Sequence, residues 1–178
     1  SSASDITFLP ALPSDASPPA PMALSHLLAS NESLRPWHRV VTTGVVTLYD
    51  PGELLVIQDA SGSLLIHTRQ VDNLSIGQRV SVTGFVTAID GVTAMEFGQF
   101  TPLPGSEAIV PRPPSFAQAM TGFYTNRLLT VDGVVVSQTR ENHAHILFLR
   151  SGDQTFQAVF RKRTYDPDPL PDYPPGTR

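Results

Sequence analysis

Four polar side chains in the first half of the chain are candidates for contacting a ligand: Tyr49, Gln58, His67 and Arg69. They lie on or beside two segments that we predict as neighbouring strands, residues 54–58 and 63–68. A tyrosine ring can stack on a ligand, and the other three side chains can hydrogen-bond it. The alternative is that all four are ordinary outward residues of a half-solvated sheet. That alternative is favoured, because a stacking platform usually carries two or more aromatic rings and Tyr49 is nearly alone.

A second candidate is the alternating pair His143 and His145. On a strand, this spacing places both imidazoles on one face, where they could hold a metal ion. The sequence offers no third ligand cluster of matching spacing. Residues 141–145 also fall where we expect a hairpin loop, so a solvated turn is the favoured interpretation. We therefore predict no metal and no other cofactor.

The remaining residues of reactive types, aspartate and serine, lie mainly in predicted turns. Five aspartates lie in predicted turns or next to glycine: Asp50, Asp59, Asp90, Asp132 and Asp153. Their spacing brings no two of them together as an acid/base pair. Ser61-Gly62 and Ser151-Gly152 are likewise turn dipeptides, and the chain contains no G-x-S-x-G nucleophile motif. We therefore predict that the protein is not an enzyme.

Composition narrows the function classes further. The 178 residues carry a formal charge of −4 with a pI near 5.6, which makes nucleic acid an unlikely partner. Cysteine is absent, which excludes disulfides and thiol catalysis and suits an oxidising compartment. No run approaches the roughly 18 apolar residues of a membrane-spanning helix. Because the sequence begins with Ser1, we expect a processed product or a fragment, attached to a membrane only through segments outside this chain.

The part of the chain most informative about fold is residues 40–100. Its apolar runs and turn signals predict five strands, at residues 41–48, 54–58, 63–68, 78–87 and 93–100. An Asp90-Gly91 hairpin turn joins the last two. An amphipathic helix precedes them at residues 22–30 and is expected to cover one end of the structure. Five strands with a capping helix fit a small Greek-key barrel of the oligonucleotide/oligosaccharide-binding (OB) type, with a β-sandwich as second choice.

The same order of elements returns in the second half of the chain. After a helix at residues 115–120 with a possible Ser115 cap, we predict strands at residues 128–136, 146–149 and 155–160. The predicted organisation is all-β. It comprises a Pro-rich N-terminal linker (1–21), a first OB-like barrel (22–103), a Pro-rich connector (104–114) and a second OB-like domain (115–178).

The second copy is predicted to be incomplete at its C-terminus. Pro175-Gly176-Thr177-Arg178 matches Ile76-Gly77-Gln78-Arg79, which enters the fourth strand of the first copy. The second domain thus lacks its fourth and fifth strands, which leaves an unpaired edge and an uncovered core. We expect that the parent chain continues, that the sheet packs on the first barrel, or that a partner completes it. Homo-oligomerisation through this edge is one form of the last possibility.

The runs GVVTLYDPGELLVIQDASGSLLIHT, LSIGQRVSVTGFV and LLTVDGVVVS carry a resemblance to a known family. Over residues 24–178 the chain resembles the tandem OB-like extracytoplasmic region of bacterial sensor histidine kinases and related signalling proteins. The resemblance implies a periplasmic or other extracytoplasmic sensor domain of a two-component system, without catalytic residues of its own.

The expected function is therefore a non-enzymatic sensory or interaction module that binds an unknown small ligand or protein partner. The alternative is an OB-fold protein that binds nucleic acid or oligosaccharide. Salt-dependent binding would be the signature of the nucleic-acid case.

Overall fold

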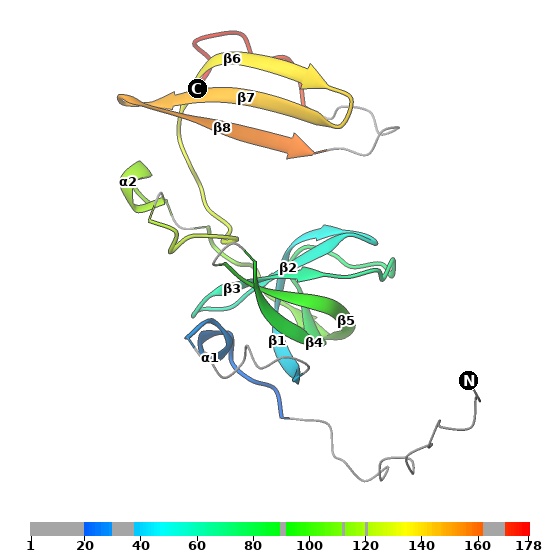
Figure 1. Cartoon of the computed structure of the whole chain (residues 1–178). Coiled ribbons are helices and arrows are strands. Elements are labelled where there is room, and N and C mark those ends of the chain that lie inside the picture. Colours follow the sequence, from blue (N-terminus) through cyan, green and yellow to red (C-terminus); the bar gives the residue numbers. More distant parts are fainter. Residues whose placement is uncertain (1–19, 30–37, 90–91, 112, 120, 162–169) are drawn as a thin grey trace, which may run out of the picture. The chain divides into compact units, whose positions relative to one another are not determined.

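The computed structural model describes residues 20–29, 38–89, 92–111, 113–119, 121–161 and 170–178, and the chain divides into two units, Ser1–Ala108 and Ile109–Arg178 (Figure 1). Most of the predicted linker and the predicted Asp90-Gly91 turn lie outside the described residues.

The first unit is a closed barrel of five strands. These are β1 (Arg39–Asp50), β2 (Leu54–Gln58), β3 (Ser63–His67), β4 (Gln78–Ile89) and β5 (Val92–Ser106). Their order around the barrel is β1-β2-β3-β5-β4, and β4 pairs with β1 to close it. All neighbours are antiparallel except β3 and β5, which pair in parallel at Leu65 and Ile66. A small closed barrel of five strands is the OB-type architecture that the sequence predicts for this half of the chain.

The core of the first unit is built from alternate residues of all five strands. The largest inward side chains are fully buried: Val46, Leu55, Ile57, Leu64, Ile66, Val80, Val82 and Met95. Helix α1 (Leu24–Ala29) adds Leu24 and Leu27 to the same cluster, which confirms that this helix covers the barrel core. Each such side chain contributes roughly 1.5–3 kcal/mol through removal from water.

Thr42 anchors the segment that leads into helix α1. Its side chain is fully buried, and its Oγ1 donates a hydrogen bond of 2.8 Å to the carbonyl of Met22. The backbone N–H of Met22 in turn donates to the carbonyl of Val41 at 2.7 Å. The helix is therefore held by a short parallel bridge to β1 as well as by its leucines.

Thr42→Val removes the hydroxyl while it keeps the shape of the side chain. We expect a loss of about 1–2 kcal/mol in the free energy of unfolding, because the Met22 carbonyl loses a partly buried donor. Chemical denaturation measures the loss, and amide exchange at Leu27 is expected to quicken. The matched control is Thr43→Val on the outward face of the same strand. An equal loss in both variants would contradict this assignment.

Strand β5 is longer than the sequence predicts. It runs to Ser106, past the expected end at Phe100 and into the predicted connector, and Pro102 lies opposite Val80 of β4. β5 pairs with β3 only at Ala94 and Met95. Beyond Met95, the side of β5 that faces away from β4 is therefore a sheet edge, where proline is tolerated.

The second unit contains helix α2 (Phe116–Ala119) and a three-stranded antiparallel sheet. Its strands are β6 (Val134–Glu141), β7 (Ala144–Ser151) and β8 (Gln154–Arg161), in the order β6-β7-β8. Ser115 caps α2 as predicted, since its N–H donates to Oε1 of Gln118 (3.0 Å) and its Oγ accepts from the N–H of Gln118 (3.3 Å).

The predicted strand at residues 128–136 is wrong in its first part, because β6 begins only at Val134. In the first unit, the early residues of β1 pair with β4. Leu129 forms a single β-bridge, and among the described residues of the second unit no further strand stands in the place of β4. Instead, the C-terminal segment (red in Figure 1) meets β6 at Val135, whose N–H donates to the carbonyl of Thr177 at 2.8 Å.

Candidate ligand-binding surface

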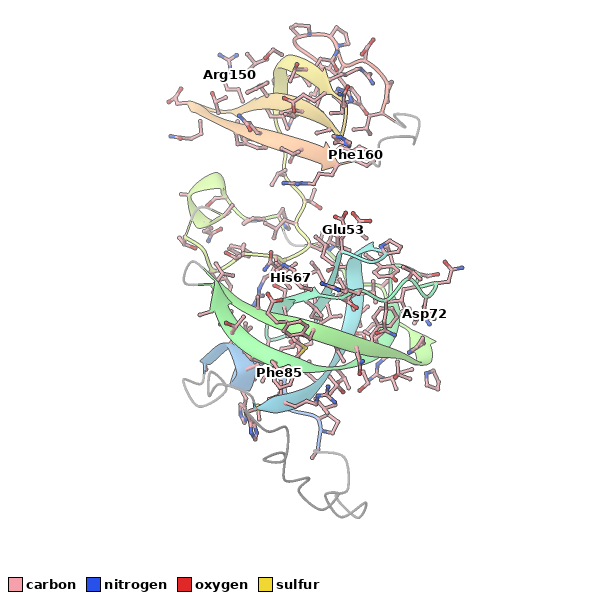
Figure 2. All side chains as sticks on the ribbon, turned by 45° about the vertical axis from the view of Figure 1, so that its right-hand side comes forward. Glu53, His67, Asp72, Phe85, Arg150 and Phe160 are labelled. Atoms are coloured by element: carbon pink, nitrogen blue, oxygen red, sulfur yellow. The ribbon has the colours of Figure 1, made fainter. Side chains whose placement is uncertain are left out.

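The outer face of the first barrel carries a row of polar and aromatic side chains, which we call the outer strip: Arg39, Phe85, Glu96, Phe97 and His67. The strand register creates it. Arg39 of β1 lies opposite Phe85 of β4, and Phe85 lies opposite Glu96 of β5. Nδ1 of His67, at the end of β3, completes the row by donating to Oε1 of Glu96 at 2.6 Å. Figure 2 labels His67 and Phe85 on the barrel.

The aromatic part of the outer strip is exposed. Phe97 is 70% exposed, and its ring meets Phe85 edge to face with centroids 6.5 Å apart. The guanidinium of Arg39 lies 5.5 Å from the centroid of the Phe85 ring, within range of a cation–π contact. Two phenyl rings and an arginine thus form one continuous surface that a ligand can stack on.

Phe97 has an unusual backbone conformation, with φ at 53°. A bulky residue in this left-handed region is strained by about 1–3 kcal/mol. The cause lies in a β-bulge between Thr83 and Phe85, where β5 carries one extra residue opposite β4. The next residue, Gly98, packs so closely that a Cβ there would overlap Cγ2 of Ile66. The bulge therefore turns Phe97 outward.

The polar part of the outer strip is the pair of His67 and Glu96. The two side chains are 42% and 32% exposed, so their hydrogen bond adds at most about 1 kcal/mol to stability. Its effect is to orient the imidazole. With Nδ1 turned to Glu96, Nε2 is the ring nitrogen that can contact a ligand.

The four side chains predicted as ligand contacts do not form one site. Gln58 lies opposite Ser63, whereas His67 lies opposite Leu54, so they occupy opposite ends of the β2–β3 pair. At about 3.3 Å per residue, these ends are roughly 13 Å apart. Arg69 is exposed two residues after His67, so these two share one end.

Tyr49 has a structural role in this arrangement. Its hydroxyl donates to the carbonyls of Gln70 (3.1 Å) and Asp72 (2.8 Å), and its ring packs edge to face on Phe100 at 5.6 Å. The tyrosine therefore fixes the segment after β3 against the barrel. A role in ligand contact stays a prediction for this residue.

Sequence analysis did not single out Phe85, Glu96 or Phe97. One signal was available for Phe85, which lies between two inward residues of β4, Gly84 and Val86, and so must point outward. No comparable signal exists for Phe97, because the bulge that redirects it depends on how β5 pairs with β4.

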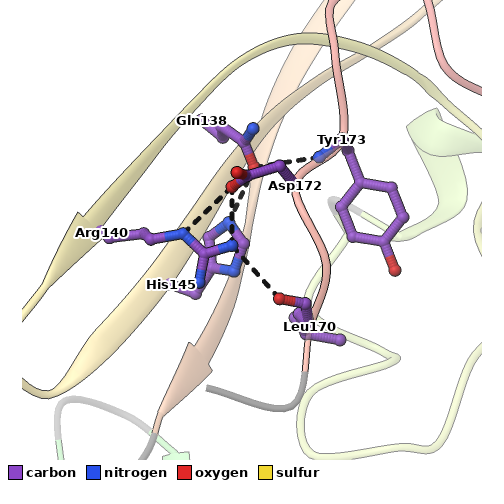
Figure 3. A network of polar contacts seen from close by, with 6 residues as sticks. All are labelled: Gln138, Arg140, His145, Leu170, Asp172 and Tyr173. Atoms are coloured by element: carbon purple, nitrogen blue, oxygen red, sulfur yellow. Dashed lines mark hydrogen bonds and ion pairs between the residues drawn. The ribbon is translucent and has the colours of Figure 1, made fainter. Parts of the chain in front are cut away.

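His145 is not in a solvated turn, and that part of the prediction is wrong. Only Asn142 and His143 form the turn, while His145 lies on β7 and is fully buried. Its Nε2 donates to Oε1 of Gln138 at 2.9 Å, and the same oxygen accepts from the N–H of Tyr173 at 3.3 Å (Figure 3). His145 is buried and His143 is exposed, so the two imidazoles lie in different environments.

The C-terminal segment covers His145. Arg140 of β6 contacts Oδ1 of Asp172 through Nη2 (2.7 Å) and Nε (3.2 Å), and Nη2 also donates to the carbonyl of Leu170 (3.2 Å) (Figure 3). These polar contacts fasten residues 170–173 to the sheet and shield the imidazole.

Within the described part of the chain, no group of three or more His, Asp or Glu residues is placed to hold a metal ion. None of its helices has the length and apolar character needed to cross a membrane.

No family model matches the chain, and no curated protein matches it. Solved structures give distant similarities. A hypothetical protein, ygiW, from E. coli has a TM-score of 0.39 and 17% identity, covering 48% of this chain and 91% of its own. A murine DNA binding protein bound with double-stranded DNA has a TM-score of 0.39 and 8% identity, covering 68% and 72%. The Ifi202 HINa domain in complex with DNA has a TM-score of 0.36 and 9% identity, covering 74% and 81%. The fold assignment therefore rests on strand order and register.

Proposed function

We propose that this chain is a non-enzymatic interaction module of tandem OB type from an extracytoplasmic bacterial signalling protein, and that it binds a protein partner through the outer strip. The observation that carries the proposal is Phe97, an exposed phenylalanine in a strained backbone conformation. Strain of this kind is retained where it has a use, because Gly or Asn would adopt the same φ more easily.

The chemistry of the outer strip favours a protein partner. Aromatic side chains and arginine are enriched at protein interfaces and often carry most of the binding energy. Phe97, Phe85 and Arg39 supply this combination on a strand framework that is already folded. His67 and Glu96 add polar contacts at one end of the row, so the surface has an apolar centre with a polar rim.

The tandem arrangement is supported by a shared register. Val46 of β1 lies opposite Ile57, and a bulge follows before Leu48. Val135 of β6 lies opposite Leu149, and a bulge follows before Ser137. Each valine stands two residues after a glycine, Gly44 or Gly133. Two sheets that share pairing, bulge and glycine position fit a duplicated OB-type unit.

The signalling and extracytoplasmic parts of the proposal are supported by the family resemblance and by the absence of cysteine. In such a protein, a partner that binds one arrangement of the two units better than another shifts the population toward that arrangement. The rest of the signalling protein would then respond to the shift.

A second candidate is the binding of oligosaccharide or single-stranded nucleic acid. The observation that favours it is the same pair of rings beside Arg39, since bases stack on aromatic side chains and on arginine. The net charge of −4 weighs against nucleic acid. Titration with oligothymidylate and with a chitin oligosaccharide, followed by NMR, distinguishes the candidates.

Phe97→Gly separates binding from stability. Because glycine tolerates a φ of 53°, we expect the melting temperature to stay unchanged or to rise. Peptides selected from a displayed library on the wild-type protein are expected to lose about tenfold or more in affinity, the loss typical of an interface hot spot. The control is Thr101→Ala, at an exposed position of β5 outside the outer strip.

Peptides that bind wild type and Phe97→Gly equally would exclude the outer strip as the partner site. Binding of oligothymidylate that weakens with salt, or of the chitin oligosaccharide, at these same residues would favour the second candidate instead.

A further inference from the structure

Strand β5 places two core residues at a spacing that a regular strand does not allow. Met95 is fully buried and Phe100 is 4% exposed, and both belong to the hydrophobic cluster of the first barrel. They are separated by an odd number of positions, so regular alternation would put them on opposite faces of the sheet. The bulge between Thr83 and Phe85 of β4 supplies the extra residue on β5 that lets both face the core.

The same bulge decides where Phe97 points. Counted from Met95, regular alternation would turn the Phe97 side chain toward the core. In the structure it is 70% exposed, with φ at 53°. Burial of Phe100 and exposure of Phe97 are therefore two consequences of one extra residue. A slip of β5 by one residue would reverse both and bury one phenylalanine in exchange for the other.

A glutamine side chain holds Phe100 in its buried position. The parallel pairing of β3 with β5 ends at Ile66 and Met95. Beyond it, Oε1 of Gln70 accepts from the N–H of Phe100 at 2.5 Å, and Nε2 of Gln70 donates to the carbonyl of the same residue at 3.3 Å. One side-chain amide thus binds both backbone polar groups of Phe100, as a residue of a paired strand does.

Gln70 is itself fixed to the first barrel. Its carbonyl accepts from the hydroxyl of Tyr49 (3.1 Å) and from the N–H of Gly52 (2.8 Å). Its N–H donates to Oγ1 of Thr68 (3.2 Å), which is buried. The ring of Tyr49 also packs edge to face on Phe100. We call Gln70, Tyr49 and Phe100 together the Phe100 latch.

The residues on both sides of Phe97 are fixed as well. Glu96 is paired with β4, and its carboxylate accepts from Nδ1 of His67. Gly98 packs so closely on Ile66 that no larger residue fits there. Because β5 is held before and after Phe97, the extra residue stays in one place and the strained conformation persists.

We propose that Gln70 is a positioning residue of the outer strip: through the Phe100 latch, it selects the register of β5 in which Phe97 faces outward. Opening of the latch lets β5 slip by one residue, which relieves the strain and withdraws the Phe97 ring. The hydrogen bonds of the latch and the strain at Phe97 are of similar size, so loss of the latch shifts the population between the two registers. Regulation of this kind rests on the binding role of the outer strip proposed above.

The affinity of the outer strip then follows the latched population. A partner that needs the Phe97 ring binds only the latched register, so its apparent dissociation constant rises as the fraction of latched molecules falls. By the same linkage, a bound partner stabilises the latch. Partner binding and opening of the latch therefore oppose each other.

Gln70→Met opens the latch, because it keeps the length of the side chain and removes both hydrogen bonds to Phe100. In the full chain we expect the NMR cross-peak between the amide and α protons of Phe97, which is strong at positive φ, to weaken. The contact between the Phe97 and Phe85 rings is expected to be lost. Peptides selected on the wild-type protein are expected to lose about fivefold or more in affinity, because fewer molecules present Phe97.

The matched control is Gln78→Met, in the turn before β4. Oε1 of Gln78 accepts from the N–H of Ser75 at 3.1 Å, so this variant also loses a hydrogen bond from glutamine to the backbone. Gln78 lies opposite Ser106, at the far end of β5 from Phe97. We expect it to leave the Phe97 cross-peak and the peptide affinity unchanged.

A second measurement needs no partner. In a Phe97→Gly chain, glycine cannot replace Phe100 in the core, so no slipped register compensates for loss of the latch. Gln70→Met is therefore expected to lower the melting temperature by a few degrees more in the Phe97→Gly chain than in wild type. Tyr49→Phe, which removes only the hydroxyl that binds Gln70, opens the latch more mildly and gives the same readouts where Gln70→Met fails to fold.

An unchanged Phe97 cross-peak in the folded latch variant would overturn the proposal, and so would equal losses of melting temperature in the two backgrounds. A changed cross-peak without any peptide binding to wild type would support the latch and exclude the outer strip as the partner site. Peptide binding with an unchanged cross-peak would have the opposite meaning.

Discussion

Gly84→Val is expected to lower the melting temperature of the first unit by roughly 10–20 °C. A Cβ at this position would lie 2.6 Å from Cγ of Met95 and 2.9 Å from the backbone carbonyl oxygen of Glu96. The methionine can move, but the carbonyl belongs to the β4–β5 ladder and cannot. Overpacking of about 3 kcal/mol, converted by the unfolding entropy of a domain of this size, gives the stated range.

The control for this prediction is Ala88→Val, which places the same valine side chain at an exposed position of β4. It is expected to change the melting temperature by only a few degrees, since β-branched residues suit strands. Differential scanning calorimetry measures both variants. A similar small shift in both would mean that β4 and β5 are further apart at Gly84 than the structure places them.

Leu55→Ala is expected to cost the first unit about 2–5 kcal/mol, while Leu147→Ala costs the second unit less than about 1.5 kcal/mol. The two leucines hold matching positions in their sheets, but only Leu55 is fully buried. Truncation of a buried leucine loses transfer free energy and leaves a cavity, whereas a half-exposed leucine loses only part of the former.

Native-state amide exchange measures these two costs separately. Amides of β2 report opening of the first unit, and amides of β7 report opening of the second. Equal costs at the two positions would mean that the face of the second sheet is covered as fully as that of the first, which would contradict the observed difference in burial.

Much of the first barrel could be predicted from sequence because its signals are local. Strands β2 and β3 match their predicted cores, since Asp59-Ala60-Ser61-Gly62 is a strong turn signal between two short apolar runs. Here the side chain of Asp59 accepts from the N–H groups of Ser61 and Gly62, at 2.7 and 2.9 Å. Helix α1 was also predictable, because Leu24 and Leu27 have helical spacing and both reach the core.

The features that could not be predicted depend on distant partners. Gln70 is an example, since its side-chain amide accepts from the N–H of Phe100 (2.5 Å) and donates to the carbonyl of the same residue (3.3 Å). The side-chain amide of Gln70 thus makes the hydrogen bonds to β5 that a neighbouring strand backbone would otherwise make. No local sequence pattern predicts this contact. The outer strip could not be predicted for the same reason, because it depends on the bulge that exposes Phe97.

Gly44 and Gly133 lie where a side chain of the neighbouring strand approaches the backbone closely. Gly44 faces Ile57, with its ideal Cβ position 3.0 Å from the Cβ of that residue, and Gly133 faces Leu149 at 3.2 Å. These glycines allow a side chain from the paired strand to pack over the backbone. Their matching positions in the two units support the repeat proposed above.

The central claim is that the second unit repeats the first as far as the turn before β4. Backbone NMR distances in the 178-residue chain test it most directly. We predict contacts of Gly77 with Val46, of Gly176 with Val135 and of Val80 with Gly44. Absence of the contact between Gly176 and Val135 would contradict the claim.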